Sequence, residues 1–140
     1  MKLNPDCMRA VMLEIEQQWE IGTEPNGYLY LGVVKLQQLY DALDKYSKED
    51  IFYSLYNLEQ AGYLDLVVSM AAGGVVLDCT VNHMTYDGHE FLNRIRDPKH
   101  WSVIKSGLSA VRNYSLDAIN SIAGGITSAA ITAFFEHNPL

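Results

Sequence analysis

The fold is decided by residues 46–85, which read YSKEDIFYSLYNLEQAGYLDLVVSMAAGGVVLDCTVNHMT. The first part of this stretch predicts a helix, because Ser47 and Asp50 have the spacing of a capping box in which Asp replaces the usual Glu. Gly62 then predicts a left-handed stop to the helix. One face of the helix carries the apolar residues Ile51, Leu55 and Leu58.

The rest of the stretch predicts a β-hairpin, because apolar residues alternate in two runs that are joined by Ala71-Ala72-Gly73-Gly74. The alternating apolar residues are Leu64, Leu66, Val68 and Met70 in the first run, and Val75, Leu77, Cys79 and Val81 in the second. Since Cys79 lies on the apolar face of its strand, we expect it to be a core thiol.

Before this stretch, Asn4 and Pro5 are typical of a helix start, and a helix is predicted through Trp19. A loop at 22–27 and a short strand at 28–34 follow. A short helix then has the apolar residues Leu36, Leu39, Tyr40 and Leu43.

After the stretch, Thr85 is predicted to cap one helix, and Asp97-Pro98 is predicted to end that helix and begin another. The apolar face predicted for the second of these helices is Trp101, Ile104, Leu108 and Val111.

The predicted order is helix, short strand, helix, helix, hairpin, helix. This order indicates an α+β fold that is mainly helical, namely a winged helix-turn-helix with a C-terminal helical extension. We place the winged-helix domain at residues 1–98 and the extension at residues 99–140. In such a fold the helix before the hairpin is the one usually offered to DNA, and the hairpin is the wing.

The end of the chain carries no charge between residues 118 and 135. A heptad-like stripe runs through it, consisting of Ile119, Ile122, Ile126, Ala129 and Ala133. This stripe predicts a helix that packs on the domain or dimerises with a second copy. A membrane span is disfavoured, because it needs about 20 predominantly apolar residues and this run is shorter and diluted by polar side chains. A tail without fixed packing partners is the remaining alternative.

Charge is distributed unevenly over the 140 residues, whose net charge is -7. Residues 1–93 have 5 basic and 14 acidic groups. A basic patch is predicted just beyond them, made of Arg94, Arg96, Lys99, Lys105 and Arg112. It is either a phosphate-binding surface or the solvated back of a helix.

Four sequence blocks and one tryptophan carry a family resemblance. The blocks are residues 2–7, 46–51, 58–63 and 85–97, and the last is followed by Trp101. With them the chain resembles domain-of-unknown-function family 2513, small proteins common in phages and prophages of Gram-positive bacteria. The resemblance covers residues 2 to about 105 and weakens after residue 112. It implies a winged-helix fold and a phage or mobile-element origin, but no activity.

Catalytic and metal-binding patterns are weak. Cys79, His83 and His89 lack the paired ligand spacing of structural zinc sites. No nucleophile elbow or phosphate loop occurs, and paired acidic residues are most simply helix caps and surface. We therefore expect a protein that is not an enzyme and that has no cofactor or metal.

The helix and wing that would touch DNA are poor in cations. The outward residues predicted for the helix are Lys48, Glu49, Tyr53, Tyr56, Asn57 and Gln60, and the wing tip is Ala72, Gly73 and Gly74. Only Lys48 is cationic, and base and phosphate contacts need donors such as Arg and Lys. Tyrosines, by contrast, are common anchors of protein interfaces. The alternative is that these tyrosines are half-buried in the core and the acidity serves only solubility.

These observations favour a non-enzymatic, phage-type accessory protein that binds a host or defence-system protein which itself handles nucleic acid. The alternative is a dimeric DNA-binding transcription regulator, in which Lys48, Tyr53 and Asn57 read the groove. We expect a homodimer in either case. Two cysteines and a start without the apolar core of a signal peptide favour the cytoplasm.

Overall fold

A computed structural model describes residues 1–125, 133 and 135–137 of the chain. It is an α+β protein, as predicted. The elements in chain order are α1 (Pro5–Gln18), β1 (Ile21–Thr23), β2 (Leu29–Leu31), β3 (Val34–Lys35), α2 (Leu36–Ala42), α3 (Lys48–Gln60), β4 (Leu64–Ala71), β5 (Val75–Met84), α4 (Tyr86–Ile95), α5 (Pro98–Val111) and α6 (Leu116–Gly124). One turn of 3-10 helix, Ala72–Gly74, joins β4 to β5.

The predicted helix starts are confirmed by their hydrogen bonds. The Asn4 side chain accepts from the Cys7 amide, and Ser47 Oγ accepts from the Asp50 amide at 3.1 Å. Thr85 Oγ1 accepts from the Gly88 amide, and Asp97 caps the start of α5. These caps satisfy amides that have no partner inside the helix, which is why the sequence signals were reliable.

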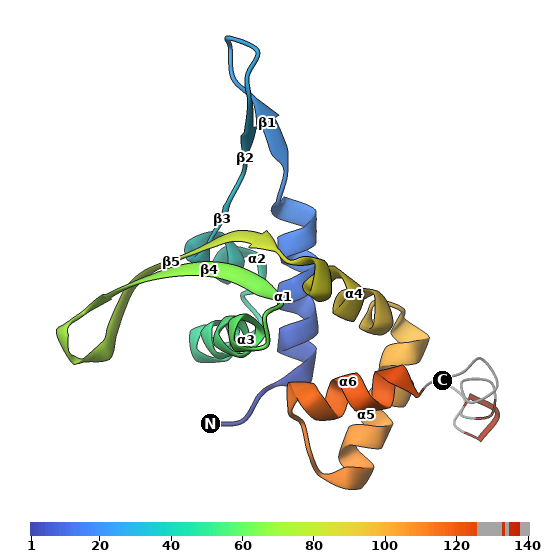
Figure 1. Cartoon of the computed structure of the whole chain (residues 1–140). Coiled ribbons are helices and arrows are strands. Elements are labelled where there is room, and N and C mark those ends of the chain that lie inside the picture. The colour runs from blue at the N-terminus through green and yellow to red at the C-terminus, as the bar shows by residue number, and fades with distance from the viewer. Residues whose placement is uncertain (126–132, 134, 138–140) are drawn as a thin grey trace.

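Three strands form the sheet next to the helices, in the order β3-β5-β4 with antiparallel pairing. β4 and β5 pair along their whole length from Leu64↔Met84 to Ala71↔Val75, as the predicted hairpin requires. Gly73 and Gly74 at its tip both have positive φ angles, of 80° and 78°, which glycine adopts at little cost. The hairpin curves away from the body above α3 (Figure 1).

One hydrophobic core joins both parts of the chain. α1 lies at its centre and packs against α3, α2 and α4. Residues before and after position 98 share this core, since Met12, Leu55 and Phe91 belong to the same cluster as Trp101, Ile104, Leu108 and Ile119. The predicted extension therefore packs on the rest of the described chain through α5 and the start of α6.

Two predicted features are corrected. The predicted loop at 22–27 and strand at 28–34 are instead a separate hairpin, β1–β2, and a short strand β3. The Asn26 side chain and the left-handed Gly27 close the turn that makes this hairpin possible. Val111 was predicted on the apolar face of its helix but is 61% exposed, because the helix ends there and Arg112 turns left-handed.

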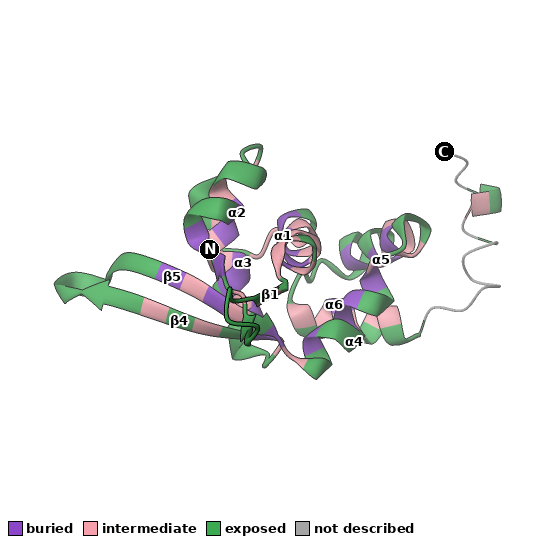
Figure 2. Cartoon of the chain, turned by 90° about the horizontal axis from the view of Figure 1, so that it is seen from above, coloured by how far each residue is buried: buried purple, intermediate pink, exposed green. Residues whose placement is uncertain are grey.

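The alternating apolar residues of β4 and β5 contact the core along only half of the hairpin. Leu64, Cys79 and Val81 are buried, whereas Met70, Val75 and Leu77 are exposed. Figure 2 shows this change of burial along the hairpin, whose far half is exposed on both strands. The hairpin is therefore longer than the core needs.

Candidate functional site

The outer face of α3 divides into two halves. Lys48, Glu49, Tyr56 and Gln60 are exposed, as predicted for an outward face. Tyr53 and Asn57 are half-buried instead. The Tyr53 hydroxyl donates to the carbonyl of Met1 at 3.2 Å, and Asn57 Nδ2 donates to the Tyr53 carbonyl at 2.8 Å. The start of the chain thus covers part of the surface that the sequence predicted to be open.

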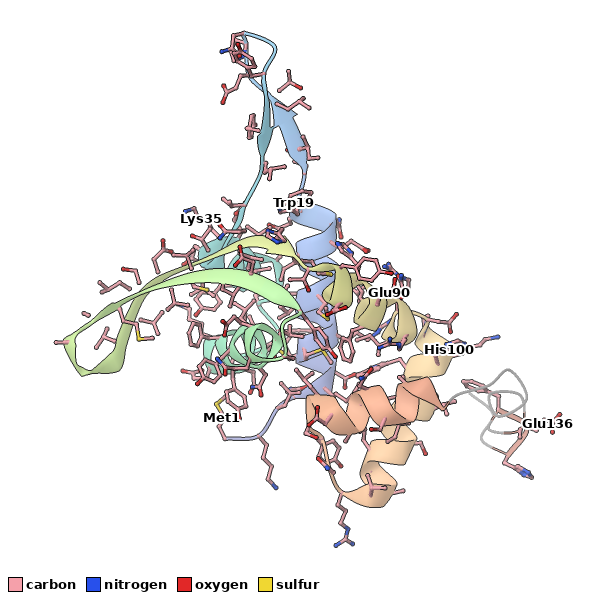
Figure 3. The ribbon with its side chains drawn as sticks, in the orientation of Figure 1. Met1, Trp19, Lys35, Glu90, His100 and Glu136 are labelled. Atoms are coloured by element: carbon pink, nitrogen blue, oxygen red, sulfur yellow. The ribbon has the colours of Figure 1, made fainter. Side chains whose placement is uncertain are left out.

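A groove of about 410 Å³ lies between the open half of α3 and the β4–β5 hairpin. Its walls are mainly apolar, with Glu59 as their one charged residue. The groove is lined by Phe52, Tyr56 and Glu59 from α3 and by Leu66, Val68, Met70, Gly74 and Val76 from the hairpin. Figures 1 and 3 show the curved hairpin beside α3, and these are the two elements whose side chains line the groove.

Exposed apolar side chains continue from this groove onto the rest of the hairpin. Met70, Val75 and Leu77 are 61%, 56% and 64% exposed. Val67 is 58% exposed on the opposite face of the hairpin, because its neighbours Leu66 and Val68 point into the groove. The predicted wing tip, Ala72, Gly73 and Gly74, is also exposed. Clustered exposed apolar side chains on a soluble protein usually mark a binding site. We call α3's exposed half, the groove and the far half of the hairpin the α3–hairpin face.

The charge of the α3–hairpin face is negative. Residues 64–84 contain Asp65, Asp78 and His83 but no lysine or arginine. On α3 the single cation is Lys48, whose ammonium lies 5.3 Å from the centre of the Tyr40 ring. Glu49 and Glu59 on the same helix are exposed. This distribution suits a partner with apolar and basic side chains better than a polyanion.

The predicted basic patch is largely taken up by contacts within the chain. Arg96 makes a two-pronged contact with Glu16, at 2.8 and 2.7 Å, and the Arg96 hydrogen bonds lower the pKa of that carboxyl. Lys105 lies 3.2 Å from Asp6. Arg94 donates to the side chain of Asn120. Lys99 and Arg112 are exposed. Contacts within the chain therefore involve three of the five cations of the predicted patch, while Lys99 and Arg112 stay open to solvent.

A second cavity brings cations beside the covered half of α3. It has a volume of about 630 Å³, and Lys2 and Arg112 line it together with Tyr53 and Asn57. The other lining residues are Leu3, Ser109, Asn113, Tyr114 and Ser115. In this cavity the predicted helix residues Tyr53 and Asn57 meet Arg112, a member of the predicted basic patch.

The two cysteines lie in the core, as expected for Cys79. Burial raises the pKa of Cys79 to about 11 and also raises the pKa of Cys7. Thiols of this kind are poor nucleophiles and poor metal ligands. Among the described residues, no three histidine, cysteine or acidic side chains are grouped as metal ligands would be.

The predicted dimerisation stripe is only partly within the described residues. Ile119 is fully buried in the core, and Ile122 packs over Gly107 of α5. Ala133 is exposed in a helical segment, while Ile126 and Ala129 lie outside the described residues. The described start of the stripe thus packs against its own chain. Over the described residues, no helix combines the length and hydropathy that a membrane span requires.

The β1–β2 hairpin is an exposed element that was not predicted from the sequence. It rises from the end of α1, away from the rest of the chain (Figure 1). Its exposed apolar residues include Ile21, Tyr28, Leu29, Tyr30 and Leu31. The signal was present, since Pro25-Asn26-Gly27 stands between two runs rich in β-formers.

One protein-family model matches most of the described helices and strands. The family model described as "Hypothetical protein (DUF2513)" matches residues 2–113. The chain belongs to domain-of-unknown-function family 2513. The match to family 2513 includes the α3–hairpin face and ends before α6, close to the place where the sequence resemblance weakens.

A relative from Haemophilus influenzae, described as an uncharacterized protein, is 29% identical over 129 residues. The alignment spans 91% of this chain and 97% of that protein, so the two have nearly the same extent. No solved structure matches the chain.

Proposed function

We propose that this member of family 2513 is a non-enzymatic winged-helix protein that binds another protein through its α3–hairpin face. The observation that carries the proposal is the composition of that face. It combines an apolar groove and exposed Met70 and Leu77 with an absence of lysine and arginine from residues 64–84. Large exposed apolar side chains favour a protein partner, and a hairpin with no lysine or arginine of its own disfavours phosphate. The Lys35 ammonium of β3 lies beside the hairpin, where it donates to Thr80 Oγ1.

The winged-helix assignment rests on element and strand order. A helix, a short strand, two helices and a hairpin follow one another as α1, β3, α2, α3 and β4–β5, apart from the inserted β1–β2 hairpin. The strand from between the helices pairs with the second strand of the hairpin, giving β3-β5-β4. In this interpretation α3 is the helix that a winged helix presents, and β4–β5 is the wing.

The partner we favour is a host or defence-system protein that handles nucleic acid. Such proteins carry basic surfaces, and the acidic residues Glu49, Glu59 and Asp78 around the α3–hairpin face would complement them. The phage-type role follows from the family resemblance and makes the protein an inhibitor or modulator of that partner.

The proposal is tested by affinity capture from bacterial lysate with matched variants. Tyr56→Ala and Leu77→Ser alter the α3–hairpin face, while Val111→Ser removes a comparably exposed side chain, 61% against 64% for Leu77, on α5. We expect one protein to be captured by wild type and by Val111→Ser, and lost with the other two. Capture that is indifferent to Tyr56 and Leu77, or no captured protein, would overturn the proposal.

A DNA-binding regulator is the second candidate. Two observations favour it: the winged-helix element order, and the cavity in which Lys2 and Arg112 lie beside Tyr53 and Asn57. In this function Lys48, Tyr53 and Asn57 would contact DNA. It ranks second because the Tyr53 hydroxyl and the Asn57 amide already donate within the chain.

A further inference from the structure

The cavity beside the covered half of α3 is formed where three parts of the chain meet. They are the segment before α1, the helix α3, and the end of α5 with its connection to α6 (Figure 1). The cavity volume, about 630 Å³, lies within the range of small-molecule sites, which runs from roughly 300 to 1,000 Å³. We call it the Lys2–Arg112 cavity, after the two cations that line it.

The lining of the Lys2–Arg112 cavity contains these two cations and no acidic residue. Within the described residues, neither Lys2 nor Arg112 takes part in an ion pair. Glu59 and Asp117 each lie two positions from a lining residue, but both are exposed and neither lines the cavity. In a chain whose net charge is -7, two unpaired cations in one concave place indicate a binding site for an anion.

The position of Lys2 is fixed by the residues on either side of it. The Tyr53 hydroxyl donates to the Met1 carbonyl at 3.2 Å, which holds the start of the chain against α3. Leu3, the next residue, packs against the hydrophobic core. The backbone of Lys2 is therefore held at the cavity, while its side chain stays exposed.

Arg112 stands where glycine is the usual residue. It ends α5 in the left-handed conformation, with φ 55°, and it is the one residue other than glycine with a positive φ among those described. Its amide and that of Asn113 both donate to the Leu108 carbonyl, which holds this conformation in place. Glycine would adopt it at lower cost. An arginine kept at a strained position beside a cavity points to a use for its side chain.

The other lining residues suit an anion that carries a flat ring. Tyr53 and Tyr114 bring two aromatic rings to the cavity, and such rings stack on nucleobases. Asn113 Oδ1 already accepts from the Ser115 amide, so the Asn113 side-chain nitrogen is left to donate. Ser109 and Ser115 add hydroxyl groups, which also donate to phosphate oxygens.

We propose that the Lys2–Arg112 cavity binds a nucleotide, whose phosphate contacts Lys2 and Arg112 and whose base packs against the tyrosine rings. A small ligand fits better than duplex DNA, because a long polyanion would also meet the acidic remainder of the chain. The proposal uses no residue of the α3–hairpin face, so it stands independently of the proposed function.

The test is isothermal titration calorimetry of the full chain with ADP as the probe. Wild type is expected to bind ADP. Arg112→Gly is expected to raise the dissociation constant at least about tenfold, because it removes charged hydrogen bonds to phosphate. Tyr114→Leu is expected to raise it about fivefold through lost stacking. The matched control is Lys99→Ala, which removes an exposed cation of α5 that does not line the cavity and should leave ADP binding unchanged.

Arg112→Gly also separates binding from folding. Because glycine adopts the left-handed conformation at little cost, the melting temperature of this variant should not fall below that of wild type. A wild type that does not bind ADP, or an Arg112→Gly variant that binds it equally well, would overturn the proposal. Inorganic phosphate that binds as tightly as ADP would overturn the assignment to a nucleotide, since the ring would then contribute nothing.

A further titration separates the nucleotide from nucleic acid. Duplex DNA that displaces ADP, and whose binding is lost in Arg112→Gly, would overturn the proposal in favour of the DNA-binding regulator. Arg112→Gly is expected to retain the captured protein that Tyr56→Ala loses. Failure of this inference and failure of the proposed function therefore give different results.

Discussion

At the scale of single residues, cations that the sequence gathers after Ile95 connect distant parts of the chain. Arg96 and Lys105 contact Glu16 and Asp6, which lie 80 and 99 positions away. Burial alone would raise the pKa of the Asp6 carboxyl, but hydrogen bonds from Trp101 and Lys105 lower it below its ordinary value. No local pattern announces such pairs, so the sequence could predict a cluster of charge but not its use.

Replacing Arg96 by Ala should lower the free energy of unfolding at neutral pH. The Arg96 and Glu16 side chains are 41% and 35% exposed, so solvent screening limits the loss to about 0.5–1 kcal/mol. Because Arg96 lowers the pKa of Glu16, this stability is present above the ordinary Glu16 pKa of 4.5 and is lost as the pH falls through the lowered value.

Urea unfolding of wild type and Arg96→Ala, at neutral pH and at about pH 3, measures this effect. The difference between the two proteins should shrink at the lower pH. Lys99→Ala is the control. Lys99 is an exposed cation at the start of α5, three positions after Arg96. A difference that is equally large at both pH values would show that Arg96 acts through packing instead of charge.

At the scale of elements, local signals predicted helices well and hairpins less completely. Ser47, Thr85 and Asp97 cap their helices as predicted, because a cap involves residues only a few positions apart. The apolar alternation predicted the β4–β5 hairpin, yet it gave no sign that the far half leaves the core. The β1–β2 hairpin was missed because β2 and β3 were predicted as one strand at 28–34.

The two halves of β5 should respond differently to truncation. Val81 is fully buried and pairs with both neighbouring strands, whereas Leu77 is 64% exposed. Val81→Ala should cost about 2 kcal/mol of unfolding free energy, while Leu77→Ala should change it by no more than about 0.5 kcal/mol. Chemical denaturation checks both variants. Equal losses would mean that the far half of the hairpin supports the core, which would weaken its assignment to binding.

At the scale of the whole molecule, two hairpins leave a shared helical core in different directions. The β4–β5 hairpin extends over α3, and the β1–β2 hairpin rises from the end of α1 (Figure 1). Both hairpins carry leucine and valine side chains that are exposed and do not belong to the core. The family model covers both hairpins, within residues 2–113. The proposed function uses the first of these two hairpins.

The sequence predicted the class of fold and the helix-to-hairpin order, because both depend on periodicity along the chain. It could not predict which apolar residues remain exposed, since that depends on where the core ends. The candidate face shows this limit clearly. Tyr56 was predicted to point outward and is exposed. Tyr53 was also predicted to point outward, but its hydroxyl donates to the carbonyl of Met1, 52 positions away, and no local pattern predicts that contact.

The central claim is that the α3–hairpin face binds protein and not DNA, and a titration with labelled random-sequence duplex DNA at low salt tests it most directly. The account predicts no binding even at high protein concentration, because residues 64–84 supply no lysine or arginine and α3 supplies only Lys48. Binding that weakens as salt rises, and that is reduced by Lys48→Ala, would contradict the account and favour the DNA-binding regulator.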